Sequence, residues 1–148
     1  MASTISCLTQ IAIVGLGKIA VDQHVPSIAR SPAFHLAATV SRNAHAEGVD
    51  AFEDLSAMLA ARPGITAIAL CVPPQVRFAL AREALLAGRD VLLEKPPGAS
   101  LAEVAILSEL AAAHGRAGPR PRRAGRRRVC PQELTEPPVR GAWRPVGR

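Results

Sequence analysis

Two glycines separated by one residue follow a short apolar run near the start of this chain of 148 residues. The run occupies residues 11–14, and the motif G-x-G-x-x-A comes directly after it as Gly15-Leu16-Gly17-Lys18-Ile19-Ala20. In such a motif the first glycine permits a tight turn and the second lets the backbone approach a pyrophosphate, while a small third residue allows close contact between strand and helix. The N-terminus of the following helix also favours negative charge. The motif therefore predicts a dinucleotide-binding site, and an ordinary glycine turn is the alternative.

A polar group, Ser41-Arg42-Asn43, follows the second apolar run, residues 34–40. An acidic residue usually binds the adenosine ribose at this place in a dinucleotide site, but these three positions carry no carboxylate. A serine hydroxyl and a guanidinium can hold a 2′-phosphate through charge-assisted hydrogen bonds. Ser41 and Arg42 therefore predict tolerance of, or preference for, NADP, so that the cofactor is NADP or NAD. The alternative is a solvated arginine in a surface turn.

The elements that must position these residues alternate along the chain. Apolar runs that are too short for helices and apolar on both faces are typical of buried parallel strands. We expect strands at residues 10–15, 34–40, 49–52, 65–72 and 90–93, and helices at residues 54–61, 75–87 and 100–115. This alternation predicts an α/β fold, a doubly wound parallel sheet of the Rossmann NAD(P)-binding type, over residues 1–115.

Two of the expected helices carry further signals. In the helix at 75–87 the apolar residues Val76, Ala79, Leu80 and Ala84 share one face, and Gly88 ends the helix because glycine readily adopts the left-handed cap conformation. Ser100 and Glu103 form a capping box that begins the last helix.

Taken together, these motifs resemble the glucose-fructose oxidoreductase and inositol dehydrogenase (Gfo/Idh/MocA) family, and especially its galactose and arabinose 1-dehydrogenase members. The resemblance covers residues 10–115. It rests on the glycine motif running into Asp22-Gln23-His24-Val25-Pro26, on Ser41-Arg42-Asn43, on Cys71-Val72-Pro73-Pro74-Gln75-Val76-Arg77 and on Leu93-Glu94-Lys95-Pro96-Pro97-Gly98. The triplet Glu94-Lys95-Pro96 is its most specific mark.

The resemblance implies hydride transfer from the anomeric carbon of a cyclic aldose to a nicotinamide dinucleotide, giving a lactone. Lys95 would contact the substrate, since an ammonium at the end of a parallel strand can stabilise developing negative charge on oxygen; Glu94 would help to orient the cofactor. A surface ion pair is the alternative for Lys95. The resemblance also makes Cys71, Val72 and Pro73 cofactor-binding residues, with Val72-Pro73-Pro74 lining the nicotinamide ribose. Many relatives have histidine where this chain has Arg77, which argues against a cofactor contact there.

Several remaining residues are expected to be structural. His24 would suit proton transfer by its titration near neutral pH, but a packed histidine at a helix start is the favoured interpretation. Cys7, Cys71 and Cys130 are widely spaced and show no metal-binding pattern, so each is expected to be a reduced, small apolar residue.

The charged residues are distributed unevenly along the chain. The net charge is +6, yet residues 1–114 hold eight basic and ten acidic groups, whereas residues 115–148 hold ten arginines and two glutamates. Residues 116–148, rich in Arg and Pro, are therefore expected to be a disordered tail, either a product of a frameshift in GC-rich DNA or an Arg-rich arm that binds nucleic acid. The chain has only four aromatic residues, so the base-stacking surfaces that single-stranded nucleic acid needs are scarce, and a nucleic-acid partner is not favoured.

Members of the family continue into a second, larger α/β domain that carries most sugar contacts, and residues 116–148 do not resemble it. We therefore expect a truncated, inactive half of a dehydrogenase, with an exposed sheet face available for oligomer formation. The alternative is a non-catalytic nucleotide-binding protein with a basic arm. Apolar runs too short to span a bilayer predict no membrane segment, and the first ten residues lack the features of a leader, which favours the cytoplasm.

Overall fold

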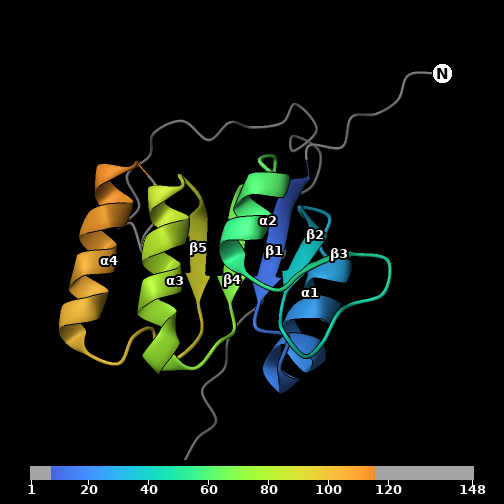
Figure 1. The fold of residues 1–148 in the computed structure, drawn as a ribbon, viewed down its shortest axis with the longest axis horizontal. Coiled ribbons are helices and arrows are strands. Elements are labelled where there is room, and N and C mark those ends of the chain that lie inside the picture. Colours follow the sequence, from blue (N-terminus) through green and yellow to red (C-terminus); the bar gives the residue numbers. More distant parts are fainter. Residues whose placement is uncertain (1–7, 116–148) are drawn as a thin grey trace, which may run out of the picture.

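Five parallel strands form one sheet in the order β3-β2-β1-β4-β5 (Figure 1). The computed structural model describes residues 8–115 of the chain. Along the chain the elements are β1 (Thr9–Val14), the π-helix η1 (Ala20–His24), α1 (Val25–Ala29), β2 (Phe34–Val40), β3 (Asp50–Phe52), α2 (Leu55–Ala61), β4 (Ala67–Leu70), α3 (Pro74–Leu86), β5 (Asp90–Leu93) and α4 (Leu101–Ala113). The predicted strands and helices are all present, although β4 is shorter than the expected residues 65–72.

Helices cover both faces of the sheet. Successive side chains of a buried strand point to opposite faces, so each face presents apolar residues that a helix must cover. In β1, Ile11 and Ile13 pack with Ala20 of η1 and Ile28 of α1. Their neighbours in β1 belong to the larger core on the other face, which includes residues from α2, α3 and α4. This arrangement confirms the doubly wound sheet expected from the sequence.

The strand register brings the carboxyl ends of the strands into one row. Val14, the last residue of β1, lies beside Val40 of β2 on one side and Leu70 of β4 on the other. Leu70 in turn lies beside Leu93, the last residue of β5. From β1 the chain continues to β2 on one side, and β4 later pairs with β1 on its other side. Ligands are expected in the crevice at the carboxyl ends of the strands, where the strand order reverses. Every residue group predicted to bind the cofactor or substrate directly follows one of these strand ends.

The predicted helix ends are also confirmed. Ser100 accepts a hydrogen bond from the Glu103 amide at 3.3 Å, and Gly88 has a positive φ of 73°. The Glu103 carboxylate accepts from the amide of Ala99 at 2.8 Å, one residue before the position that a standard capping box uses.

The apolar face predicted for α3 is only partly correct. Of Val76, Ala79, Leu80 and Ala84, only Ala84 is buried in the core, and the other buried residues of α3 are Arg77, Ala81 and Leu85. Val76, Ala79 and Leu80 line a cavity at the carboxyl edge of the sheet, and Leu80 also packs against the core. A helix that borders both a core and a cavity has apolar residues on both sides. The spacing of apolar residues in the sequence therefore does not tell which of them are buried in the core and which line the cavity.

Candidate functional site

The turn after β1 requires glycine at its first position. Gly15 has a φ of 88°, and a Cβ there would come within 2.7 Å of Val72 Cγ1 and 3.0 Å of the Cys71 carbonyl carbon. At Gly17 a Cβ would meet nothing within 4 Å. The first glycine is therefore set by the fold, whereas the second leaves open space beside the backbone, as a bound pyrophosphate would need.

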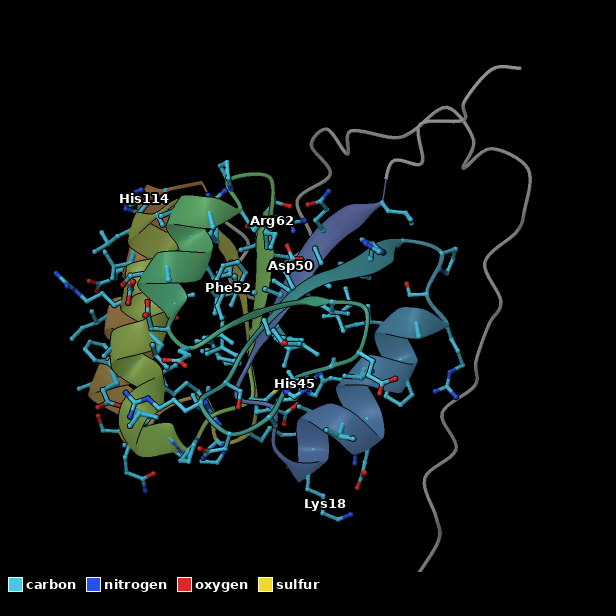
Figure 2. All side chains as sticks on the ribbon, turned by 45° about the vertical axis from the view of Figure 1, so that its right-hand side comes forward. Lys18, His45, Asp50, Phe52, Arg62 and His114 are labelled. Atoms are coloured by element: carbon cyan, nitrogen blue, oxygen red, sulfur yellow. The ribbon has the colours of Figure 1, made fainter. Side chains whose placement is uncertain are left out.

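A helix follows the glycine turn directly. The amide of Val21 donates to the carbonyl of Gly17 at 3.0 Å, and the fully buried Ala20 packs beside β1, which confirms the predicted close contact of helix and strand. Lys18 is 88% exposed and pairs with Asp22 one turn later. Figure 2 shows Lys18 pointing away from the body of the domain, at the end opposite His114.

A cavity of about 720 Å³ lies across the carboxyl ends of β1, β2 and β4. It brings together residues that the sequence analysis predicted separately: Gly15, Ser41, Arg42, Val72 and Pro73. A second cavity of about 370 Å³ continues past Ser41 and Arg42 toward His45. The volume, the apolar wall from α3 and the few polar groups suit an organic ligand of nucleotide size.

Two acidic residues in the same cavity were not identified from the sequence. Glu53 and Asp54 follow β3 and line the cavity together with Ser41 and Arg42. Asp54 is engaged as the N-cap of α2, since its Oδ1 accepts from the Ala57 amide at 2.7 Å, whereas Glu53 is exposed. Ser41 is identified because polar residues directly after a parallel strand lie at the ligand-binding edge of the sheet. The same reasoning applied to β3 identifies Glu53.

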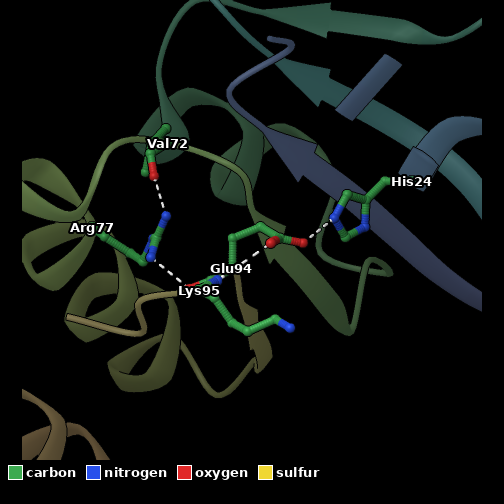
Figure 3. A network of polar contacts seen from close by, with 5 residues as sticks. All are labelled: His24, Val72, Arg77, Glu94 and Lys95. Atoms are coloured by element: carbon green, nitrogen blue, oxygen red, sulfur yellow. Dashed lines mark hydrogen bonds and ion pairs between the residues drawn. The ribbon is translucent and has the colours of Figure 1, made fainter. Parts of the chain in front are cut away.

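A network of polar contacts joins the ends of β4 and β5 (Figure 3). His24 Nε2 donates to the carboxylate of Glu94, and the guanidinium of Arg77 donates to the backbone carbonyls of Val72, Glu94 and Pro96. Arg77 is only 3% exposed. Its guanidinium therefore binds backbone carbonyls, and Arg77 is not among the residues that line the cavity. His24 is more than a packed residue, since it pairs two elements through Glu94.

Electrostatics in this network set the protonation of two groups. The pKa of Glu94 is lowered mainly by the hydrogen bond from His24, and further by the Lys95 amide and the charges of His24 and Arg77, against the opposing effect of burial. Burial, followed by the negative charge of Glu94, raises the pKa of Cys71 to about 11, with Arg77 acting in the opposite direction. At neutral pH, Glu94 is a carboxylate and Cys71 is a thiol.

Lys95 lies in the loop after β5, and its side chain is exposed. Its amide donates to Glu94 Oε2 at 3.3 Å. Within residues 8–115, no hydrogen bond or ion pair occupies its Nζ. The surface ion pair considered as an alternative for Lys95 is therefore absent from the described part of the chain.

The sheet order, the glycine turn after β1 and the cavity at the strand ends define a Rossmann domain of the kind that binds a nicotinamide dinucleotide. The chain belongs to the Gfo/Idh/MocA oxidoreductase family, since the family model of oxidoreductases with an NAD-binding Rossmann fold matches residues 9–117. None of the helices within residues 8–115 is long and apolar enough to cross a membrane.

Comparisons with individual proteins agree with the family. The chain is 47% identical over 97 residues to galactose 1-dehydrogenase from Pseudomonas fluorescens, an alignment covering 66% of this chain and 32% of that protein. The crystal structure of D-galactose-1-dehydrogenase from Rhizobium etli superposes with a TM-score of 0.74 at 50% identity, covering 79% of this chain and 38% of that one. A 3-ketoreductase from Actinomadura kijaniata, solved with NADP and TDP-benzene, shows the same fold at 24% identity, a TM-score of 0.69 and coverage of 74% and 35%. The chain thus spans 32% to 38% of the length of these relatives.

Proposed function

We propose that residues 1–115 are the cofactor-binding domain of a sugar 1-dehydrogenase, which oxidises an aldose at its anomeric carbon to a lactone. The observation that carries the proposal is that the glycine turn, Ser41-Arg42 and Lys95 follow strands that end at the same edge of the sheet, with no partner for the Lys95 ammonium among residues 8–115. The similarity to two galactose 1-dehydrogenases supports the sugar as substrate class.

Different groups of residues bind different parts of the dinucleotide. Ser41 and Arg42 bind the adenosine ribose and any 2′-phosphate, and the backbone of residues 15–19 binds the pyrophosphate. Cys71, Val72 and Pro73 line the nicotinamide ribose. The thiol of Cys71 is neutral and partly buried, so it contributes a small apolar contact rather than a nucleophile. When bound, the cofactor supplies the hydride acceptor.

Lys95 is the proposed catalytic residue. Its Nζ donates a hydrogen bond to the oxygen on the reacting carbon and stabilises the negative charge that develops there as the hydroxyl proton passes to solvent water, which reaches the exposed Lys95. Glu94, held as a carboxylate by His24, keeps a fixed negative charge beside the cofactor. The remaining sugar contacts of the whole protein would come from outside this domain, since the chain spans about a third of the galactose 1-dehydrogenases it matches. The basic tail proposed for residues 116–148 lies outside the described residues.

Calorimetric titration of the purified chain with NAD and NADP tests the cofactor site. Gly17→Val should fold, because a Cβ there meets nothing within 4 Å, and should lose roughly tenfold or more in affinity, about 1.4 kcal/mol. Gly64→Val is the matched control: Gly64 lies in the turn after α2, and its Cβ would make only an ordinary contact with Gln10 at 3.6 Å. Equal affinity in the wild type and Gly17→Val would contradict the assignment.

A further inference from the structure

A buried arginine lies beneath the loop that carries Lys95. Arg77, on the first turn of α3, is 3% exposed, and its Nη1 is 2.6 Å from the carbonyl oxygen of Glu94. The same Nη1 donates to the carbonyl of Pro96, and Nη2 donates to the carbonyl of Val72. Buried charges in proteins are normally paired with an opposite charge. Among the described residues, however, no carboxylate lies within ion-pair distance of Arg77, and its Nε has no hydrogen-bond partner.

The carbonyls bound by Arg77 belong to two neighbouring loops. Glu94 and Pro96 are the residues immediately before and after Lys95, so one nitrogen holds the backbone on both sides of it. Val72 belongs to the loop between β4 and α3, which lines the large cavity next to Gly15. A single side chain therefore joins the Lys95 loop to the wall of the cofactor cavity, as Figure 3 shows.

We propose that Arg77 is a positioning residue that fixes Lys95 relative to the Val72-Pro73 loop, and so relative to the nicotinamide half of the cofactor. This inference rests on the proposed function. A planar guanidinium holds the three carbonyls with donors on two nitrogens in a rigid fork, whereas a lysine ammonium has its three donors on one atom at the end of a flexible chain. Such precision matters for hydride transfer, because displacing a reacting group by about 1 Å can cost on the order of a hundredfold in rate.

The two lysines of the chain provide a direct spectroscopic test. Lys18 and Lys95 are the only lysines in the sequence, so reductive methylation with ¹³C-formaldehyde gives two lysine signals and one α-amine signal in an NMR spectrum. In Arg77→Ala the Lys95 signal should move and sharpen as its loop is released, while the Lys18 signal stays in place. Arg89→Ala is the matched control, since Arg89 also donates to a backbone carbonyl, that of Pro63 at 2.9 Å, at the start of β5 rather than its end. It should leave the Lys95 signal unchanged.

Cofactor fragments separate positioning from general destabilisation. ADP-ribose lacks the nicotinamide, so the ratio of NADH affinity to ADP-ribose affinity measures what the nicotinamide half contributes. Arg77→Ala should reduce that ratio by roughly tenfold, with ADP-ribose binding unchanged, because only the Val72-Pro73 loop, proposed to line the nicotinamide ribose, loses its hydrogen bond from Arg77. Millimolar guanidinium should restore both the ratio and the Lys95 signal.

If Arg77→Ala does not fold, Arg77→Lys replaces it, since it keeps the positive charge and loses the fork; a smaller change in the same direction is then expected. Equal losses for NADH and ADP-ribose, or an unmoved Lys95 signal in either variant, would overturn the positioning role. Failure of the wild type to bind both ligands would contradict the proposed function instead, and the NMR measurement would still decide whether Arg77 positions Lys95.

Discussion

The imidazole Nε2 of His24 is hydrogen-bonded to the carboxylate of Glu94, a residue 70 positions further along the chain. His24 ends the π-helical segment that follows the glycine turn, and Glu94 directly follows β5. The pair thus connects the helix that follows the proposed pyrophosphate-binding loop with the loop that carries Lys95. A π-helical turn contains one more residue than an α-helical turn and changes the direction in which later side chains point; such turns occur frequently at functional sites.

Replacing His24 with alanine should raise the pKa of Glu94, because the hydrogen bond from His24 is the main cause of its lowered value. A carboxylate whose pKa is lowered by folding adds stability that is present above the unfolded pKa, about 4.3, and is lost as pH falls through the folded pKa. The difference in free energy of unfolding between the wild type and His24→Ala should therefore be largest near neutral pH and shrink below about pH 4.

This expectation can be measured by urea unfolding across pH, together with a ¹³C NMR titration of the Glu94 carboxyl. His35→Ala serves as the control, because His35 is exposed on β2 and takes no part in the pair. A Glu94 titration that is identical in the wild type and His24→Ala would show that the hydrogen bond does not set its pKa.

The sequence predicts those parts of the site that follow from local pattern. The glycine turn, the strand ends and the helix caps depend on residues that are close in sequence, such as Gly15 after Val14 or Ser100 before Glu103. Since parallel strands end at a common edge, the placement of Ser41, Val72 and Lys95 along that edge follows once the strands are assigned. The resemblance to a family added the proposed substrate class and the proposed role of Lys95.

The network beneath Lys95 could not be predicted in the same way. The contacts of Arg77 reach residues 5, 17 and 19 positions away, and His24 reaches Glu94 across 70 positions. No periodicity encodes such contacts, because they depend on how loops from different strands pack against one another. An arginine on a helix is ordinarily exposed, so its type also argues against the burial that Arg77 shows.

Replacing Ser41 with aspartate should shift cofactor preference from NADP toward NAD. A carboxylate at this strand end repels a 2′-phosphate and accepts hydrogen bonds from the ribose hydroxyls of NAD. Ser41→Asn is the control of similar size without the charge. We expect the ratio of NADP to NAD affinity, measured by calorimetry, to fall at least tenfold in Ser41→Asp and little in Ser41→Asn, equivalent to about 1.4 kcal/mol. An unchanged ratio in Ser41→Asp would reject the role of this position in recognising the ribose.

Cys71 should react slowly with thiol reagents below about pH 9, because burial and the charge of Glu94 raise its pKa to about 11 and only the thiolate is nucleophilic. The measurement uses a chain in which Cys7 and Cys130 are replaced by serine, so that labelling reports Cys71 alone. The rate should rise steeply as the pH approaches 11. In Glu94→Gln the loss of the negative charge should lower the pKa and increase the rate at a given pH. Rapid labelling near pH 7 would contradict the assignment of Cys71 as a neutral thiol.

The chain of 148 residues should bind the cofactor without oxidising an aldose. Hydride transfer requires the anomeric carbon to be held about 3 to 3.5 Å from the nicotinamide, and most of the rate gain comes from that positioning. Within residues 8–115, Lys95 offers one exposed ammonium, which can polarise a hydroxyl but cannot orient a sugar ring.

The assay mixes the purified chain with galactose, arabinose, glucose or fucose and either NAD or NADP, and follows the absorbance band of the reduced cofactor. No increase is expected, and Lys95→Ala should bind both cofactors as the wild type does, because Lys95 is proposed to contact substrate rather than cofactor. Turnover that disappears in Lys95→Ala would contradict the expected inactivity and would show that this chain holds its sugar without a second domain.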